Sequence, residues 1–514
     1  MSQKPYYAVI DMGSNTIRLM IYCINAFGEL EEEQNLKYSA RLRTYLEDDL
    51  TINKKGIEII LKTLRHFQVI TKSFKLKDVP IIATAAVRQA KNQNEIRHMI
   101  ENETDFQFKI LSEKEEAYYG YLSVIQTTNL ENGYTIDIGG GSTEITYMEN
   151  RKMIHFHSFP FGALTLQKEF IINEKPSKKE LAKLRQFVIE QFKLIPWIKN
   201  RKLRVAGIGG SARNLSLIHQ KKNDYPLSGI HHYEFPTEQI GTMIDFLSEI
   251  PLSSRKKVDG LSKERADIII PAVQAIEAFT SYVNAPEFLM CRKGLREGFM
   301  YEKLITSNMK DRYPNITERN IDALKVKYNI NDTKVEANKK ITLMLSKTLL
   351  DEGYLSFEDA NCMESILFQA SQLSYLGDHI ESESVSQHTY YILSNTALDG
   401  MNHKQRIILA LLASYKNKST FEHFAAPYSS WFKEGELNQI ELLGAILKLA
   451  YFLNTTNRNI VEQITLENKK HDSFTLMIGC NDEFLFEQQK CEKHIKHLEK
   501  ALSIEVTLNF RLLS

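Results

Sequence analysis

Two short stretches of the sequence place a carboxylate next to glycines and small polar side chains. Asp-Met-Gly-Ser-Asn occupies 11–15, and Asp-Ile-Gly-Gly-Gly-Ser-Thr occupies 137–143. Each follows an apolar run and precedes another, within AVIDMGSNTIRLMI (8–21) and YTIDIGGGSTEITYM (134–148). We interpret them as two copies of one strand-turn-strand unit, one in each half of a duplicated α/β structure. Two such halves facing each other would form a cleft.

Glycine suits a turn that binds an anion. It has no Cβ and permits positive φ, so backbone N–H groups can point at one place and an anion can approach them. Hydroxyl and amide side chains in the same turns add further donors. The residues that we expect to contact phosphate in the two turns are Gly13, Ser14, Asn15, Gly139, Gly140, Gly141, Ser142 and Thr143.

The two aspartates suggest a metal, because a carboxylate repels a bound phosphate unless a cation lies between them. Asp11 and Asp137 therefore predict a divalent ion with oxygen ligands, Mg²⁺ or Mn²⁺. The alternative is a pair of ordinary hairpins, since short glycine motifs also occur by chance. The repetition of the whole unit favours the metal-phosphate site.

A third glycine turn, GIGGSARN at 207–214, follows a strand-like run and opens a helix-like one. Gly209 and Gly210 could bring backbone N–H groups to a phosphate at the start of that helix. Turns of this kind also serve helix packing alone, so both interpretations stay open.

Arginines supply the candidate phosphate-binding side chains. Arg88 follows VPIIATAAV (79–87), which is expected to form a buried strand, and the carboxyl end of a strand is where an α/β sheet presents ligands. Arg18 and either Arg41 or Arg43 are lesser candidates for the same role. A solvated surface arginine is the alternative for each of these lesser candidates.

The elements that must position these residues alternate between strand and helix up to about residue 303, which is typical of an α/β fold. EKEEAYYGYLSVIQT (113–127) predicts one of the helices. From about 316 to 463 nearly every segment has helical periodicity. The tail then predicts two strands, a helix over 488–502 and a last strand.

We therefore expect four domains. Two α/β lobes would span 1–125 and 126–305, an α-helical domain 316–460, and a small α+β domain 461–514. The polar segment TSNMKDRYPN (306–315) is the expected linker, because it ends in a proline turn signal.

Composition limits the classes of partner. The 514 residues include 65 Lys and Arg against 64 Asp and Glu, so no overall field would attract nucleic acid or a membrane surface. No apolar run approaches the ~20 residues of a membrane span. The start, MSQKPYYAVIDMGSN, lacks the regions of a signal peptide, which predicts a cytoplasmic protein. Five scattered cysteines fit reduced thiols.

Eight segments together resemble the exopolyphosphatase/guanosine pentaphosphate phosphohydrolase family, a branch of the actin, Hsp70 and sugar-kinase superfamily. In the order that family shows, they are AVIDMGSNTIRLMIY, ATAAVRQAKN, ILSEKEEAYYGYLSV, TIDIGGGSTEI, FPFGALTL, GIGGSARNL, LSKERADIIIPA and GLREGFM. The resemblance spans most of the chain. It implies two actin-like (ribonuclease H-like) lobes around a cleft, and a homodimer.

The resemblance also implies roles for acidic residues. A glutamate in the EEA segment of the family acts on the attacking water, and in this chain that residue is Glu116. A solvated first-turn glutamate, favoured by the helix dipole, is the alternative, and it suits Glu113 and Glu115 well. Asp137 and Glu144 resemble the acids associated with the metal and the phosphates, with Asp11 doing similar work from the other lobe.

The helical segment over 373–418 resembles the HD-like domain that follows the phosphatase lobes in longer family members. Metal-dependent HD hydrolases need a His-Asp doublet, further histidines and a later aspartate as ligands. Here the doublet position reads Ser374-Tyr375 and the late aspartate position reads Asn454. We therefore interpret this domain as a degenerate HD module without catalysis of its own.

Asp378-His379 has the reverse order of the doublet and is expected to be a surface pair. His388, at a family position, is expected to serve packing or phosphate contact. The helical domain would then wall a channel for a long anionic chain. Its candidate basic residues, with three from the second lobe, are Lys416, Lys418, Arg255, Lys256 and Lys257.

The sequence thus predicts a metal-dependent exopolyphosphatase that releases orthophosphate from the ends of inorganic polyphosphate by in-line attack of water. A guanosine pentaphosphate phosphohydrolase is the alternative within the same enzyme class. A kinase fits less well, because the EEA and LSKERAD segments are those of the phosphatases. A protein that senses phosphate or nucleotide without hydrolysis is the alternative from another class.

Overall fold

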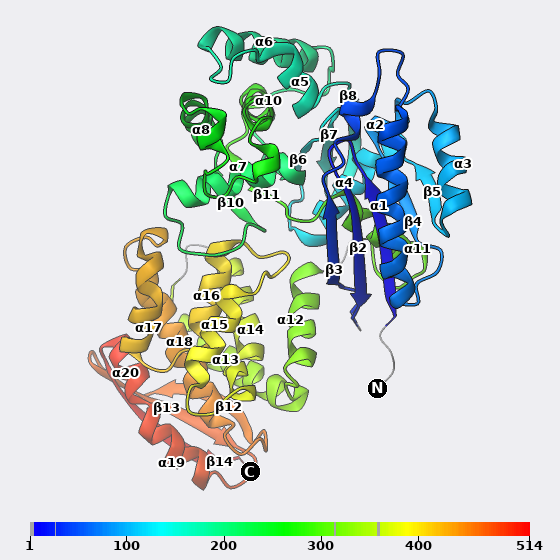
Figure 1. Ribbon diagram of the computed structural model, residues 1–514. Helices are drawn as coiled ribbons and strands as arrows, with labels where there is room; N and C mark the ends of the chain where they lie inside the picture. Colours follow the sequence, from blue (N-terminus) through cyan, green and yellow to red (C-terminus); the bar gives the residue numbers. More distant parts are fainter. Residues whose placement is uncertain (1–4, 26, 313–314, 357–359, 514) are drawn as a thin grey trace. The chain divides into compact units, whose positions relative to one another are not determined.

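The structure is a computed structural model that describes residues 5–25, 27–312, 315–356 and 360–513 (Figure 1). The chain divides into two compact units. Unit 1 comprises Met1–Tyr225 with Gly229–Ile316, and unit 2 comprises Pro226–Ser228 with Thr317–Ser514. Each unit is described by itself below.

Unit 1 contains two sheets, and the first has the order β3-β2-β1-β4-β5. β1 and β2 form an antiparallel hairpin, whereas β4 and β5 extend the sheet in parallel from β1. Buried aliphatic residues such as Ile10, Leu19 and Ile81 form its core with the helices on one face. The elements are β1 (Tyr6–Met12), β2 (Ile17–Ile24), β3 (Leu30–Tyr38), η1 (Leu42–Tyr45), α1 (Lys54–Ser73), β4 (Pro80–Ala83), α2 (Ala85–Arg88), α3 (Gln93–Glu103) and β5 (Gln107–Ile110).

The second sheet has the order β10-β11-β9-β6-β7-β8 and repeats the hairpin. β6 pairs antiparallel with β7 and parallel with β9, as β1 does with β2 and β4. Aromatic and aliphatic side chains fill its core. The elements are β6 (Gly133–Ile138), β7 (Thr143–Glu149), β8 (Lys152–Phe159), α5 (Ala163–Phe170), α6 (Lys178–Lys193), β9 (Val205–Ile208), α7 (Gly209–Lys222), β10 (Tyr233–Pro236), α8 (Gln239–Glu249), α9 (Leu252–Arg255), η2 (Lys263–Arg265), α10 (Ile269–Tyr282) and β11 (Glu287–Met290).

Helices α4 (Glu113–Thr127) and α11 (Leu295–Thr306) pack against each other and join the two sheets. One buried cluster contains Val9 of the first sheet, Leu289 of the second, and Leu122 and Met300 of the two helices. The two sheets therefore share a core, which fixes the separation of the loops that face each other.

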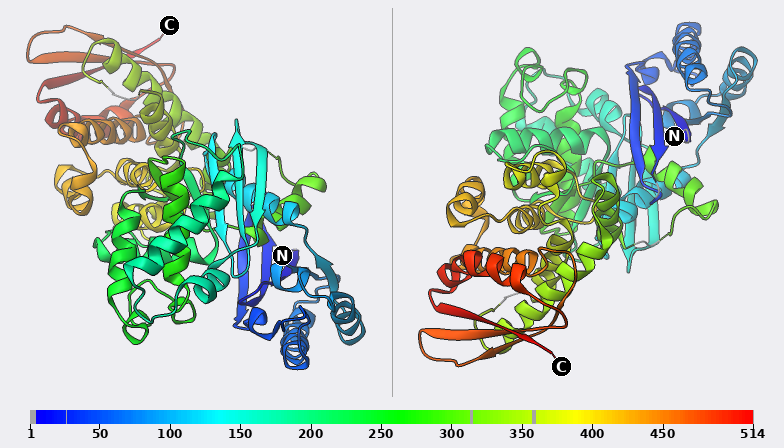
Figure 2. Two further views of the ribbon diagram at one scale, coloured as in Figure 1. Left: turned by 90° about the horizontal axis from the view of Figure 1, so that it is seen from above. Right: turned by 90° about the horizontal axis from the view of Figure 1, so that it is seen from below.

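Unit 2 is helical, with a small sheet of order β12-β13-β14. Helices α19 and α20 pack on α18 and β14 (red and orange in Figure 2). Its elements are α12 (Ile316–Lys327), α13 (Asp332–Asp351), α14 (Ala360–Leu373), η3 (Leu376–His379), α15 (Val385–Asn395), α16 (His403–Ala413), α17 (Lys418–Ala425), η4 (Ala426–Trp431), α18 (Glu436–Leu453), β12 (Val461–Glu467), β13 (Ser473–Cys480), α19 (Leu485–His494), α20 (Lys496–Leu502) and β14 (Glu505–Leu512).

Two expected elements are wrong in part. The strand expected over 79–87 ends at Ala83, and the chain turns into the short helix α2. A run of small apolar residues does not by itself distinguish a buried strand from a buried helical turn. The helix expected over 488–502 is divided at Ile495 into α19 and α20. The expected linker over 306–315 includes residues 313 and 314, which lie outside the described residues.

The residues at the HD positions form structural hydrogen bonds. The Tyr375 hydroxyl donates to the carbonyl of Tyr415 at 2.7 Å, and Ser374 Oγ donates to the carbonyl of Ala370 at 2.9 Å. Asn454 is buried and its Nδ2 donates to Asn338 Oδ1 at 3.1 Å.

Asp378 and His379 are exposed on η3, and His388 packs beside Gly377.

In the part of the chain that the structure describes, no helix is both long and apolar enough to cross a membrane.

Candidate active site

A cavity of about 270 Å³ lies between the β1-β2 turn and the β6-β7 turn. Its walls also include the start of α7, Glu116 of α4 and the segment 292–296 before and within α11. The structure therefore brings the three predicted glycine turns and the predicted glutamate to one place. The predicted site residues that line this cavity are Asp11, Gly13, Ser14, Asn15, Arg18, Glu116, Asp137, Gly139, Gly140, Ser142, Gly209 and Gly210.

The two hairpin turns close in the same way. Gly13 N donates to Thr16 O at 2.9 Å, and Gly139 N donates to Ser142 O at 3.0 Å. The duplicated strand-turn-strand unit is thus confirmed in backbone detail. Among the site glycines, only Gly209, in the third turn, uses the positive φ that glycine permits, with φ of 78°.

The glycines of the β6-β7 turn instead permit close packing. Ala163 N and Leu164 N, at the start of α5, donate to the carbonyls of Gly139 and Gly140, both at 2.9 Å. A Cβ on Gly162 would lie 2.7 Å from the backbone of this turn. The turn is therefore held against the first residues of α5.

Asp137 and Glu144 are directly opposite each other on β6 and β7. A Cβ at Gly209 would collide with the Asp137 carboxylate, so glycine there makes room for the acid. Burial raises the pKa of Asp137 to about 6, although Arg265 opposes the shift. Burial, together with Glu116 and Asp137, also raises the pKa of Glu144, which accepts a hydrogen bond from Ser158 Oγ at 2.9 Å.

Glu116 lies in the first turn of α4, where the capping role belongs to a neighbour. Ser112 and Glu115 form a capping box, with Ser112 Oγ accepting from Glu115 N and the Glu115 carboxylate accepting from Ser112 N. Glu116 points into the cavity instead, 2.7 Å from the guanidinium of Arg88. Burial raises its pKa to about 7; Arg88 opposes this shift, whereas Asp137 and Asp11 add to it.

Asp11, from the first sheet, completes the acidic group. Its Oδ2 lies 3.8 Å from Arg296 Nε, and burial raises its pKa in spite of Arg296 and Arg18. Three carboxylates that line one cavity, together with Glu144 next to it, thus all have protonated forms that burial favours. Such a group is stabilised in its ionised form when a cation binds.

These carboxylates fit a divalent ion that is shared with phosphate. No three of Asp11, Glu116, Asp137 and Glu144, all of them described, bring oxygen atoms within 4.8 Å of one another. Mg²⁺ usually keeps several waters and binds one or two carboxylates plus substrate phosphates, rather than a cage made only of protein ligands. The donor set therefore fits Mg²⁺ with a phosphorylated substrate.

Several cations of the site were not predicted as individual residues. Arg265 approaches so closely to Gly210 that a Cβ there would collide with its guanidinium. The sequence did contain a signal for three of them. Arg213, Arg265 and Arg296 lie in GIGGSARNL, LSKERADIIIPA and GLREGFM, three of the segments that carry the family resemblance. The additional cavity-lining cations are Lys37, Arg213, Arg265, Arg292 and Arg296.

Other predicted residues stand beside the cavity. The expectation that the Thr143 side chain would donate to phosphate is wrong, because it is buried and donates to Phe161 O at 2.8 Å. Arg41 pairs with Asp267, and Arg43 donates to Gln89. Residues outside the cavity lining are Arg41, Arg43, Arg88, Gly141, Thr143 and Glu144.

The expected contribution of Arg255 to a basic channel wall is also wrong. Arg255 is buried, and its guanidinium donates to the carbonyls of Ile250, Ala266 and Glu174. It is a structural arginine, which a count of basic residues in the sequence cannot distinguish from an exposed one.

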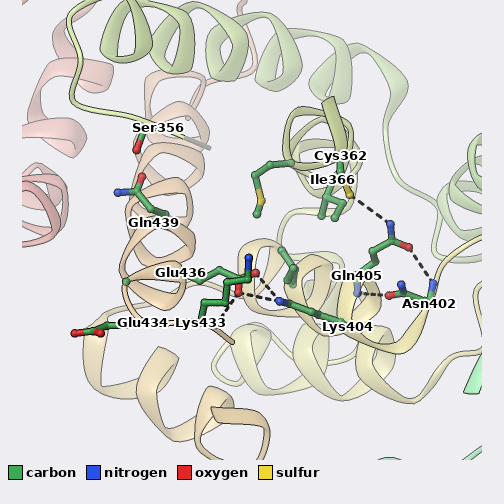
Figure 3. A pocket seen from close by; sticks show the side chains of 13 residues that line it. Ser356, Cys362, Ile366, Asn402, Lys404, Gln405, Lys433, Glu434, Glu436 and Gln439 are labelled. Atoms are coloured by element: carbon green, nitrogen blue, oxygen red, sulfur yellow. Dashed lines mark hydrogen bonds and ion pairs between the residues drawn. The ribbon is translucent and has the colours of Figure 1, made fainter. Parts of the chain in front are cut away.

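A larger cavity, of about 620 Å³, lies within unit 2 between α14, α16 and the start of α18 (Figure 3). Two of its four charged residues pair with each other, since Lys404 Nζ lies 2.8 Å from the carboxylate of Glu436. Gln405 Nε2 donates to Cys362 Sγ at 3.4 Å. Apolar side chains such as Ile366 and Ile408 form much of the remaining wall.

Known proteins resemble both parts of the chain. Residues 29–307 match the Ppx/GppA phosphatase family, and residues 316–497 match Ppx/GppA phosphatase, domain III. The chain is 24% identical over 479 residues to the guanosine-5'-triphosphate,3'-diphosphate pyrophosphatase of Pseudoalteromonas atlantica, covering 91% of this chain and 90% of the relative. It is 24% identical over 311 residues to exopolyphosphatase 1 of Mycobacterium tuberculosis, covering 58% of this chain and 87% of the relative.

Solved structures agree with the two-lobed fold. A Ppx/GppA family member of Aquifex aeolicus superposes with a TM-score of 0.53 at 25% identity, covering 59% of this chain and 99% of that one. An exopolyphosphatase of Cytophaga hutchinsonii superposes with a TM-score of 0.54 at 21% identity, covering 60% of this chain and 100% of that one. At this identity the likeness supports the fold alone. The expected actin-like lobes are confirmed, and the chain belongs to the Ppx/GppA phosphatase family.

Proposed function

We propose that this phosphatase is an exopolyphosphatase, which releases orthophosphate from the ends of inorganic polyphosphate by metal-assisted in-line attack of water. The observation that carries the proposal is Glu116, a carboxylate whose side chain is only 14% exposed and has a pKa of about 7, and which faces two glycine turns in one cavity. A general base is most effective when its pKa lies near the working pH.

Glu116 would accept a proton from the attacking water or orient that water. Arg88 acts through Glu116, because its guanidinium binds the carboxylate at 2.7 Å and the carbonyl of Leu111 at 3.0 Å. Two fixed partners on one guanidinium hold the glutamate in a single orientation. We therefore assign Arg88 as a positioning residue for the base.

The turns and arginines would hold the phosphoryl oxygens. Hydrolysis of a phosphoanhydride needs little covalent chemistry from the protein, because alignment of water and neutralisation of charge supply most of the catalysis. The Gly13 and Gly139 turns provide backbone donors from opposite sides, and Arg265 provides a cation that neighbours Asp137.

Mg²⁺ or Mn²⁺ would be held by Asp11 and Asp137, with Glu144 behind Asp137. When bound, the ion would neutralise charge on the transferred phosphoryl group. Glu144 would act through Asp137, since its own carboxylate already accepts from Ser158.

Hydrolysis of guanosine pentaphosphate is the second candidate, because the relative that matches 91% of the chain carries that activity in its name. The lining of the cavity supports polyphosphate as the first candidate substrate. Among the described residues that line it, no aromatic ring is present to stack on a purine, and the apolar contacts are few.

We further propose that the protein is a cytoplasmic homodimer with no nucleic-acid or membrane partner.

The decisive assay measures orthophosphate released from long-chain polyphosphate and from guanosine pentaphosphate, with Mg²⁺ and with chelator. We expect release from polyphosphate that chelator abolishes. A strong preference for the nucleotide would replace the first candidate by the second. Failure to hydrolyse either substrate would leave a binding protein without hydrolysis.

A further inference from the structure

One short segment of the first lobe supports the β1-β2 turn. Arg41 N donates to Asn15 O at 2.9 Å, and Arg43 N donates to Ser14 O at 3.2 Å. Ser14 and Asn15 line the active cavity, whereas Arg41 and Arg43 lie outside its lining. The segment therefore holds the turn in place from outside the cavity.

The side chain of Arg41 extends from this segment to the second lobe. Its Nη1 lies 3.4 Å from Asp267 Oδ2, and its Nη2 donates to Glu264 O at 3.3 Å. Glu264 lies within η2, and Asp267 follows shortly after it. Lys37 of β3 adds a further contact, since its Nζ lies 3.7 Å from the Glu264 carboxylate. Two cations of the first lobe thus bind one short element of the second.

The element η2 also carries a cation of the active cavity. Arg265 lines that cavity, and its Nη1 donates to Ser211 Oγ at 3.3 Å. Its guanidinium occupies the space beside Gly210, at the start of α7. Arg41 therefore connects η2, and Arg265 with it, to the β1-β2 turn on the other side of the cavity.

The two hairpin turns also approach each other directly. A Cβ on Gly140 would lie 3.0 Å from the Cβ of Ser14, and a Cβ on Gly141 would lie 3.5 Å from Ser14 Oγ. Glycine at these positions lets turns from different lobes come close together. Such packing permits the approach, whereas the polar contacts of Arg41 are directional and can fix the separation of the lobes.

The backbone of Arg41 does not explain why an arginine is present. Its φ of 48° and ψ of 45° are those of the left-handed region, which glycine and asparagine tolerate better than arginine does. The contacts of the guanidinium do explain it. Asp267 gains from them in turn, because its other oxygen, Oδ1, is buried without a hydrogen-bond partner among the described residues.

We propose that Arg41 is a positioning residue for hydrolysis, which fixes the separation between the β1-β2 turn of one lobe and Arg265 of the other. The proposal rests on the proposed function, because it requires both groups to bind the same phosphate chain. The side chains of Arg41 and Asp267 are 42% and 33% exposed, so their pairing stabilises this arrangement only modestly. Its loss should weaken substrate binding rather than the chemical step, since bound substrate itself bridges the two groups.

The test compares three variants of the full chain by steady-state release of orthophosphate. Arg41→Asn removes the guanidinium and suits the left-handed backbone better than arginine does, so this variant should fold. Arg41→Lys keeps a positive charge at the same place. Arg65→Gln is the matched control, because Arg65 forms an ion pair with Glu103 inside the first lobe and outside the cavity lining.

We expect Arg41→Asn to raise KM about 2- to 5-fold, the usual effect of a partly exposed ion pair, with kcat changed less than about 2-fold. Arg41→Lys should restore part of the loss, and Arg65→Gln should leave both constants unaltered. Adding Asp267→Asn to Arg41→Asn should raise KM no further, because the two residues act as one pair.

Three results would overturn the proposal. They are an unaltered KM in Arg41→Asn, a fall in kcat without a rise in KM, and effects of Arg41→Asn and Asp267→Asn on KM that multiply as those of independent sites do.

A binding measurement separates this question from the proposed function. Isothermal titration with tripolyphosphate, in the Glu116→Gln background, should give a dissociation constant about 2- to 5-fold higher when Arg41→Asn is added. If the unsubstituted protein released orthophosphate from neither substrate, the proposed function would fail. The titration would still decide the role of Arg41, because an unchanged dissociation constant contradicts it.

Discussion

The active cavity and the cavity of the helical unit differ in how their charges are arranged. In the helical unit, the cavity of about 620 Å³ contains a lysine and a glutamate that neutralise each other. In the two-lobed unit, the cavity of about 270 Å³ gathers carboxylates whose pKa values rise and three arginines, Arg18, Arg213 and Arg265, whose pKa values fall. The difference teaches that unbalanced charge, rather than volume, marks the place where a charged substrate and a metal belong.

The largest expected effect separates the two cavities by catalysis. Glu116→Gln removes the base and should reduce kcat by about 10²- to 10⁴-fold while substrate still binds. Glu436→Gln makes the same chemical change in the helical cavity and should leave kcat unaltered. Steady-state release of orthophosphate measures both variants, and near-normal turnover by Glu116→Gln would contradict the assigned role.

A smaller effect is expected behind the metal site. Glu144→Gln should raise the Mg²⁺ concentration needed for half-maximal activity by about 10- to 100-fold, the usual cost of losing a partner behind a metal ligand. Glu149→Gln, at the exposed end of the same strand, is the control. The measurement is a Mg²⁺ titration of activity, and coincident curves for the two variants would exclude Glu144 from the metal site.

The pH dependence should follow Glu116, whose pKa is about 7. A base acts when it is ionised, so kcat/KM should rise with pH and should fall about 10-fold per unit below that pKa. Because this pKa lies above the ordinary value of 4.5, the folded protein binds the proton more tightly than the unfolded chain does. The stability of the metal-free protein should therefore decrease as pH rises from about 4.5 to about 7.

Two measurements check the sign of that dependence. A pH profile of kcat/KM should have its acid limb near 7, and the metal-free protein should unfold at lower temperature at pH 7 than at pH 5. Glu116→Gln should flatten the second profile. If the stability of the unsubstituted protein and of Glu116→Gln increased equally from pH 5 to pH 7, groups other than Glu116 would determine the pH dependence of stability.

The smallest effect is expected in the helical cavity. Lys404→Met breaks the ion pair with Glu436, in which both side chains are partly exposed, and should change the free energy of unfolding by less than about 1 kcal/mol. Activity should stay the same. Lys37→Met, which removes a cation from the lining of the active cavity, should instead raise KM. Urea unfolding and initial rates give the two readouts.

The repeated hairpin was predictable from sequence because its signal is local. An apolar run, an aspartate and a glycine turn lie within fifteen residues, and the structure repeats them as β1-β2 and β6-β7. The helix that carries Glu116 was predictable for the same reason, with its first and last residues as expected. Strand β4 was predicted too long, since nothing local in 79–87 marks where the strand ends.

The group of arginines that line the active cavity was not predictable in this way, because its members are far apart in the sequence. Arg18 and Arg296 come from opposite ends of unit 1 and meet only through the shared core between the sheets. Conversely, Arg255 and Thr143 had suitable chemistry but are buried in structural hydrogen bonds. A residue type shows what a side chain can do, whereas only the fold determines whether it is available.

The packing of the triple-glycine turn against the first residues of α5 has an energetic consequence. A run of three glycines in a solvated loop samples many conformations, and ordering it around a phosphate would cost conformational entropy at each binding event. Here the first two carbonyls of that run are bound by Ala163 N and Leu164 N. The entropy is therefore lost once, when the chain folds, and more of the interaction with phosphate remains as affinity.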